Sequence, residues 1–266
     1  LLLFGTVADV VPLLSENRYW VRHGLAHINK HESYALSVLK KNTNFVKPAV
    51  GSMDVGFFLA PQLNALGRLD DPRQGVRFLI GNDTEEVDRV GKVLHEMNQA
   101  RKNVERAIVQ EIEQLIESKQ IDVSKENVVI AASPNWPAGV IGLVASRIVS
   151  KYGKPTILFH LTKSGLAKGS CRSIQEFNIF DALTASKDIL KSFGGHSAAA
   201  GLSLEATRIP ELKAALEKLV FELCTEFDLK QKLLLDADAD LSDFNERCMK
   251  DMTHMEPFGH KNHQPY

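Results

Sequence analysis

The feature that most constrains this chain is one long helical pattern near its middle. Apolar residues recur at steps of three or four from Val90 to Leu115, interrupted only by Gly91, and this is the period of an amphipathic helix. The stretch Asn82–Glu86 precedes the pattern with N-cap residues and two acids, which favour a helix start. A helix this long does more than cover a core. We therefore expect a connecting helix over residues 84–118 that joins two lobes.

The residues before this helix predict the end of a first lobe. Leu1–Phe4 is expected to be a buried strand that ends in a turn, and Asn17–Ile28 has helical spacing. The segment 43–54 is rich in Asn, Pro and Gly and is expected to be a loop, followed by a compact helical region over 62–68.

The residues after the helix alternate between strand and helix patterns, which predicts an α/β fold with helices covering a sheet. A further strand is expected over 233–240, at the start of another unit. The expected strands are 128–132, 156–160, 166–170 and 198–204, and the expected helices are 140–152, 179–190 and 209–227.

Composition limits the function classes. A net charge of −1 means that a polyanion must be held by local groups and not by a broadly basic surface. The three cysteines are scattered, which favours a reducing cytoplasm over a disulfide framework or thiolate zinc site. No apolar run has the length of a membrane span. The first and last residues resemble cut ends, so we expect a fragment of a longer protein.

Three short stretches carry residues suited to chemistry. The first is Gly5–Asp9, where a carboxylate at the end of a strand suits a divalent cation, or alternatively caps the following turn. The second is Lys168–Ser173, whose arginine and hydroxyls suit a phosphate, or alternatively form a polar surface turn. The third is Phe193–Gly201, where a Gly-Gly-His loop can approach a ligand, or alternatively is a hairpin turn with an incidental histidine.

Taken together and in order, these motifs resemble the RecJ single-strand-specific exonucleases of the DHH–DHHA1 phosphoesterase superfamily, and the resemblance covers nearly the whole chain. The motifs are Gly-Thr-Val-Ala-Asp-Val-Val-Pro-Leu at 5–13, Asn-Ala-Leu-Gly-Arg at 64–68, Trp-Pro-Ala-Gly-Val-Ile-Gly at 136–142 with Arg147, Ser-Cys-Arg-Ser at 170–173, Gly-Gly-His at 194–196 and Glu-Pro-Phe-Gly at 256–259.

The resemblance implies a domain order and an activity. Residues 1–83 would be the C-terminal part of a DHH domain, 84–118 the connecting helix, 119–228 a DHHA1 domain and 229–266 the start of an OB-fold region. The implied function is 5′–3′ hydrolysis of single-stranded DNA by two Mn²⁺ or Mg²⁺ ions in DNA repair and recombination. Implied partners are single-stranded DNA, a single-strand-binding protein and a RecQ-type helicase.

The resemblance also implies site residues. Asp9 would bind metal, and His196 and Arg172 would act near the cleaved bond. The residues expected to face DNA phosphates are Asn64, Arg68, Ser170, Arg172, Ser173, Gly194, Gly195 and His196.

Departures from the family pattern shape these expectations. The Asp-His-His signature and the other metal-binding aspartates do not occur in the chain, so we expect it to lack nuclease activity by itself. Pro137 stands where many relatives have His, and Cys171 where they have Gly, and the bulk of Cys171 is expected to crowd the phosphate. Two other functions stay open, a phosphodiesterase for short oligonucleotides or cyclic dinucleotides and a non-catalytic DHHA1 nucleic-acid-binding module.

Other candidate residues have simpler interpretations. His23, His27 and His31 recur at every fourth position, and we expect a solvated helix face there and not a metal site. Trp136 is expected to be a core or interface aromatic. The cations at 101, 102 and 106 of the connecting helix are expected to be solvated.

Overall fold

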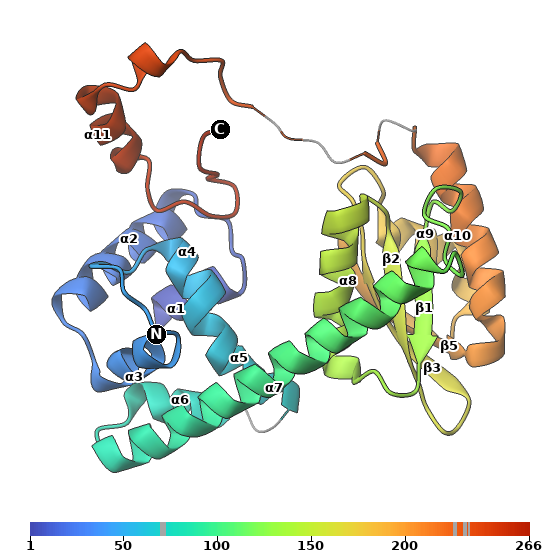
Figure 1. Ribbon diagram of the computed structural model, residues 1–266, viewed down its shortest axis with the longest axis horizontal. Helices are drawn as coiled ribbons and strands as arrows, with labels where there is room; N and C mark the ends of the chain where they lie inside the picture. Colours follow the sequence, from blue (N-terminus) through green and yellow to red (C-terminus); the bar gives the residue numbers. More distant parts are fainter. Residues whose placement is uncertain (70–72, 226–227, 231–232, 234) are drawn as a thin grey trace. The chain divides into compact units, whose positions relative to one another are not determined.

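The structure is a computed structural model that describes residues 1–69, 73–225, 228–230, 233 and 235–266, and for residues 67–69 it describes the backbone alone. The chain divides into two compact units, one formed by residues 1–100 with 233–266 and the other by residues 101–232. Figure 1 shows the helices and strands of both units, and each unit has its own hydrophobic core.

The first unit is helical in its described part. Leu3, Val21, Leu39, Leu59 and Phe78 lie at the centre of its core, with Val90 and Leu94 added from the long helix. Its helices are α1 (Leu2–Ala8), α2 (Ser15–Lys30), α3 (Tyr34–Asn42), α4 (Ser52–Asp54), a π-helical segment (Val55–Leu59), α5 (Ala60–Leu69), α6 (Arg73–Ile80) and α11 (Glu246–His254).

The strand predicted for Leu1–Phe4 is wrong, because these residues belong to the helix α1. Leu3 and Thr6, three positions apart, form its buried face. The Cβ of Leu3 lies so close to Gly24 of α2 that a side chain there would clash. A short apolar run is compatible with either element, and packing against α2 decides for the helix.

The C-terminal segment of the first unit is attached through the end of α11. Arg18 and Arg22 of α2 donate hydrogen bonds to the backbone oxygens of His254 and of residues just after it. These carbonyls are the ones that a helix end leaves without partners, so two cations there satisfy and stabilise it. The strand predicted over 233–240 is wrong for its described residues, which form no regular element.

The long helix is α7 (Thr84–Glu117), and it confirms the expected connecting helix. Asp83 accepts from the backbone N–H groups of Glu85 and Glu86, as an N-terminal cap does. Residues of α7 up to Ala100 belong to the first unit and those from Arg101 to the second. None of the helices that the structure describes is both long enough and apolar enough to cross a membrane.

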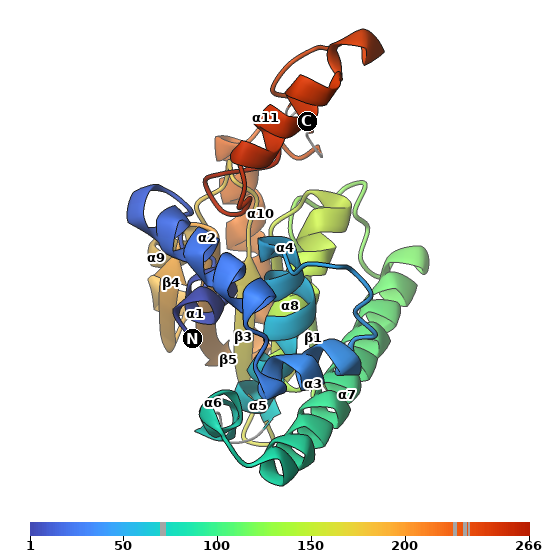
Figure 2. The same ribbon diagram turned by 90° about the vertical axis from the view of Figure 1, so that its left-hand side faces the viewer.

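The second unit contains a five-stranded sheet in the order β1-β2-β3-β5-β4. Only β1 and β2 run parallel, and the other neighbouring strands are antiparallel. Figure 2 shows β1 and β4 at opposite edges of the sheet. The strands are β1 (Val129–Ser133), β2 (Thr156–Leu161), β3 (Leu166–Arg172), β4 (Ser192–His196) and β5 (Ala199–Glu205), and the helices are α8 (Ala138–Tyr152), α9 (Ile179–Ala185) and α10 (Ile209–Leu223).

Helices cover the two faces of this sheet differently (Figure 1). One face packs on α9 and α10 through Phe159, Leu202, Leu183 and Leu216. The other face packs on α8 and α7 through Val129, Leu158 and residues of both helices. Contacts of α8 extend over β2 and β3, while residues of β5 and β4 on this side are exposed or half-buried. We call this side of β3, β5 and β4 the open face.

Candidate nucleic-acid interface

The strand β3 points two classes of side chain in opposite directions. Ala167 and Cys171 are fully buried in the core against α9 and α10. Because alternate residues of a strand face opposite sides, Lys168, Ser170 and Arg172 lie on the open face. The expectation that Cys171 crowds a phosphate is therefore wrong, since its side chain lies on the other side of the sheet. Burial raises the pKa of its thiol to about 12.

Two residues predicted from separate motifs lie in the same row across the sheet. Arg172 of β3 and His196 of β4 both pair with Ala199 of β5, from opposite sides. Two strand spacings separate them, so their Cα atoms are about 10 Å apart. The next row along the same face contains Ser170, Gly201 and Gly194. The sheet thus gathers the Ser-Cys-Arg-Ser and Gly-Gly-His motifs into one surface.

The guanidinium of Arg172 is half-buried and lacks a carboxylate partner among the described residues. Its Nη1 donates to the Oγ of Ser170 at 3.2 Å and to the backbone oxygen of Cys171 at 2.7 Å. Partial burial lowers the pKa of Arg172 from its ordinary value, but arginine keeps its charge at neutral pH. A partly desolvated cation without an opposite charge favours an anion beside it.

The helix α8 approaches Arg172 through Gly142. A Cβ at this position would lie 2.8 Å from the Oγ of Ser170 and 3.1 Å from the Nη2 of Arg172. Gly142 therefore gives these two side chains the space they occupy. The glycines of the motif at 136–142 suit either phosphate binding at a helix start or close packing of a helix on a strand, and the contacts of Gly142 fit the close packing.

Paired glycines leave the backbone bare in the middle of the open face. Gly194 pairs with Gly201, and a Cβ at Gly194 would meet no atom of the protein within 4 Å. Packing within the described protein therefore does not require the absence of a side chain there, and the bare surface permits close approach of a ligand. Gly195 differs, because it has a φ of 150° and a Cβ there would lie 2.3 Å from the backbone oxygen of Ala199.

The loop expected around Gly194–His196 is in fact the edge strand β4. Glycines have low strand propensity, which is why the sequence did not predict this strand. His196 is exposed at its end, and its Nδ1 accepts a 3.4 Å hydrogen bond from the backbone N–H of Ala198.

The two rows that contain Arg172, His196 and Ser170 do not include three other predicted residues, which are Ser173, Asn64 and Arg68. Ser173 follows β3, and its hydroxyl donates to the backbone oxygen of Phe177 at 2.6 Å. Asn64 is exposed on α5 of the first unit. Arg68 lies in the same helix, and its side chain is outside the described part of the structure.

Asp9 is the only metal ligand predicted for this chain. Asp9 is exposed at the C-terminal cap of α1, and not at the end of a strand as expected. Among the residues that the structure describes, no group of three or more His, Cys, Asp or Glu side chains is arranged to hold an ion. The described donor set does not fit a two-metal centre. His23 and His27 lie in α2, and His31 is its C-cap.

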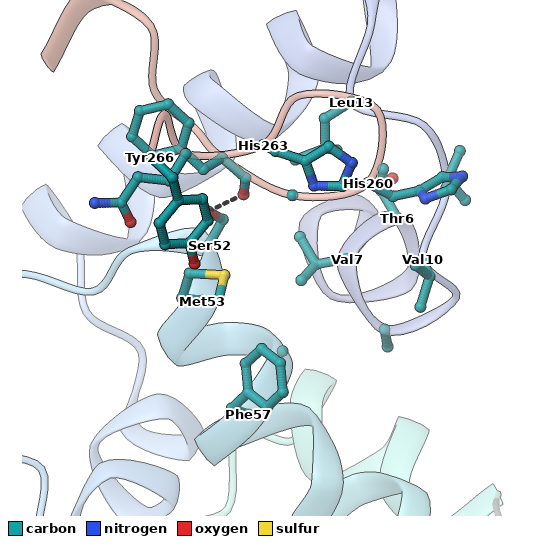
Figure 3. A pocket seen from close by; sticks show the side chains of 16 residues that line it. Thr6, Val7, Val10, Leu13, Ser52, Met53, Phe57, His260, His263 and Tyr266 are labelled. Atoms are coloured by element: carbon teal, nitrogen blue, oxygen red, sulfur yellow. Dashed lines mark hydrogen bonds between the residues drawn. The ribbon is translucent and has the colours of Figure 1, made fainter. Parts of the chain in front are cut away.

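A cavity of about 450 Å³ lies in the first unit between α1, α4 and the C-terminal segment (Figure 3). Val7, Met53 and Phe57 line it beside His260 and His263, and the hydroxyl of Ser52 donates to the backbone oxygen of Phe258 at 2.6 Å. The lining contains no Asp, Glu, Lys or Arg. The described lining therefore lacks the arginine and lysine groups that bind a phosphate chain and the carboxylates that Mg²⁺ prefers.

Within the second unit, two carboxylates of α7 interact with Arg147 of α8 and with Trp136. Buried Glu105 accepts from Arg101 at 2.7 Å and pairs with Arg147 of α8. Glu111 accepts from the indole of Trp136 at 2.6 Å, and Trp136 is buried as expected. The expectation of a solvated Arg101 is wrong, because Glu105 lies one helical turn away and pairs with it in the interior.

Comparison with known proteins identifies the class of this fold. Residues 125–222, which contain the whole sheet, α8, α9 and all of α10 except its last residue, match the DHHA1 domain family.

Proteins of one family match nearly the whole chain. The single-stranded-DNA-specific exonuclease RecJ of Bacillus subtilis is 32% identical over 98% of this chain and 33% of its own length. That of Escherichia coli is 35% identical over 84% of this chain and 40% of its own length. The crystal structure of Thermus thermophilus RecJ with Mn²⁺ matches with a TM-score of 0.84 at 27% identity, covering 99% of this chain and 38% of that one. The chain belongs to the RecJ family and spans between a third and two fifths of the length of these relatives.

Proposed function

We propose that this chain is the part of a single-stranded-DNA-specific 5′–3′ exonuclease that holds the phosphate backbone of the substrate. The relatives named above are single-stranded-DNA-specific exonucleases. The observation that carries the proposal is the half-buried Arg172 without a carboxylate partner in the described structure, beside Ser170 and in one row with His196.

The proposed roles follow from the chemistry of each group. Arg172 binds a phosphate through its guanidinium fork, and Ser170 orients that fork through its hydrogen bond to Nη1. His196 donates to the same or the adjacent phosphate. Gly194 and Gly195 allow the nucleotide backbone to lie against β4. Ser173, Asn64 and Arg68 are proposed as further contacts to the same strand of DNA.

The residues of the preceding paragraph are proposed to bind DNA, and hydrolysis of the phosphodiester bond requires other groups. Mg²⁺ and Mn²⁺ are bound in solved structures of relatives, and such ions supply an activated water and stabilise a leaving oxygen. We propose Asp9 as one metal ligand, and one carboxylate does not complete a two-metal centre. The part assigned to the described residues is binding and positioning of the substrate. The repair role, the cytoplasmic location, the domain boundaries given above and the two protein partners belong to the same proposal.

A non-catalytic nucleic-acid-binding module is the second candidate. It is favoured by the lack of a three-ligand cluster among the described residues. A phosphodiesterase for short substrates is less favoured, because the similarity to the exonucleases includes α7 and the C-terminal segment.

The test is Arg172→Ala, measured by fluorescence anisotropy with labelled (dT)12. Loss of one charge-assisted phosphate contact should weaken binding by about 1.5–3 kcal/mol. Arg247→Ala, which removes an exposed arginine of α11, is the matched control and should bind like the wild type. Unchanged affinity of the Arg172 variant would contradict the assignment.

Activity separates the two candidates. With Mn²⁺, the 266-residue chain should bind (dT)12 without degrading it, and robust degradation would contradict the incomplete metal site. The longest reading frame that contains this chain should degrade it if the exonuclease proposal holds. Binding without degradation by that longer protein would favour the module.

A further inference from the structure

The open face carries a second cation that the proposed function does not use. Lys168 is exposed on β3, four residues before Arg172 and on the same side of the strand. Its row continues through Ser203 of β5 to Ser192 of β4. The hydroxyls of these two serines are 2.6 Å apart. This row therefore offers an ammonium group and two hydroxyls, beyond the bare glycines of the neighbouring row.

The charged side chains of the open face are mainly cationic. Glu205 is the only acidic residue of β3, β4 and β5, all of whose residues are described. It lies at the last position of β5 and pairs with Lys191 at 3.1 Å. No carboxylate of these strands thus lies between Lys168 and Arg172. Such a surface attracts a polyanion through local contacts although the whole chain is almost neutral.

We propose that Lys168, with the Ser192–Ser203 hydroxyl pair, forms a second phosphate subsite, and that single-stranded DNA lies along β3 from the row of Arg172 and His196 to the row of Lys168. The inference rests on the proposed function, because it extends the same surface. Four residues of a strand rise about 13 Å, so a single phosphate that contacts Arg172 does not also contact Lys168. The subsite therefore recognises the length of the nucleotide chain.

The residues of this surface favour nucleic acid over a protein partner. Protein interfaces depend on large apolar or aromatic anchors at their centre. The three rows of the open face contain instead glycine, serine, alanine, histidine and two cations. A sheet surface of small residues lets a sugar–phosphate backbone approach both cations.

The experiment compares two ligands that differ in the number of phosphates. The wild type, Lys168→Ala and Arg172→Ala are titrated with labelled (dT)12, and dTpdT, which has one phosphate, is measured by competition. Lys168→Ala should weaken (dT)12 binding by about fivefold at low salt and reduce the salt slope by about 0.7. It should leave dTpdT binding unchanged, whereas Arg172→Ala should weaken both ligands.

Lys163→Ala is the matched control, because Lys163 is an exposed lysine in the turn between β2 and β3. Wild-type affinity of this control with a weakened Lys168 variant supports a local contact. Equal losses for the two lysine variants, or a Lys168 variant that binds (dT)12 like the wild type, overturn the subsite. An equal loss on dTpdT and (dT)12 also overturns it, since it places Lys168 at the phosphate of Arg172. If only the Arg172 variant loses affinity, the subsite fails and the proposed function stands.

Discussion

The two faces of the sheet in the second unit use the same strands for opposite purposes. One face is fully packed, with Phe159, Cys171 and Leu204 completely buried against α9 and α10. The other is covered by helices only in part, and its remaining surface carries Lys168 and Arg172 among small residues. Because neighbouring residues of a strand alternate between these faces, a core residue and a residue of the proposed binding surface are separated by a single position in the sequence.

The contrast shows where a binding surface can be placed without loss of the core. Burying large apolar side chains on one face stabilises the sheet. The other face then tolerates glycines and a cation without a carboxylate partner in the described structure, which would be costly in an interior.

Phe159→Ala should strongly destabilise the second unit without changing the binding surface. The substitution opens a cavity in the packed face and should lower the free energy of unfolding by about 3–5 kcal/mol. Denaturant titration measures this loss, with Phe221→Ala as control because Phe221 is 79% exposed. Affinity for (dT)12, corrected for the folded fraction, should equal that of the wild type. A selective loss of affinity would break the separation of the two faces.

Cys171 should make the stability depend on pH in the alkaline range. Its pKa rises from 9.0 to about 12 on burial, so above pH 9 the unfolded state loses the proton while the folded state keeps it. Stability should therefore fall as pH rises, by about 1 kcal/mol between pH 9 and 10. Denaturant titrations of the wild type and Cys171→Ala across this interval isolate the effect. Parallel curves for the two proteins would show that the thiol does not titrate as proposed.

Gly142→Ala should lower the affinity for (dT)12 more than it lowers the stability of the second unit. Alanine is the better helix former by about 1 kcal/mol, which offsets part of the cost of the close contact with Ser170 and Arg172. Displacement of the guanidinium should weaken (dT)12 binding by about fivefold, or roughly 1 kcal/mol. Anisotropy and thermal unfolding of the same preparation test both expectations. Full affinity would mean that Arg172 does not need the space above Gly142.

Periodic patterns predicted most elements of the second unit. The helix α7 was predicted because its apolar positions repeat over many turns. The strands β1, β2, β3 and β5 were predicted from the alternation of strand and helix patterns along this part of the chain. The strand β4 was not predicted, since Ser192–His196 is rich in glycine, and α1 was mistaken for a strand. Local composition does not resolve such segments, because their conformation depends on the neighbours with which they pair or pack.

Motif order also predicted which residues the candidate site contains. Ser170, Arg172 and His196 were taken from their motifs, and they lie on one face of one sheet. Lys168 was given no role, although it belongs to the stretch Lys168–Ser173, and for Gly142 the motif indicated close packing without its partners. Their contribution depends on strand alternation and on the approach of α8, which neither motif contains.

The sequence by itself determined the family, the long connecting helix and the choice of residues proposed to bind phosphate, because these depend on local pattern and residue type. The tertiary structure alone decided that Arg172 and His196 stand in one row, that Cys171 points into the core, and that Arg101 pairs with Glu105 inside the protein. These outcomes depend on contacts between residues distant in the chain, whose free energies arise only when strands pair and helices pack.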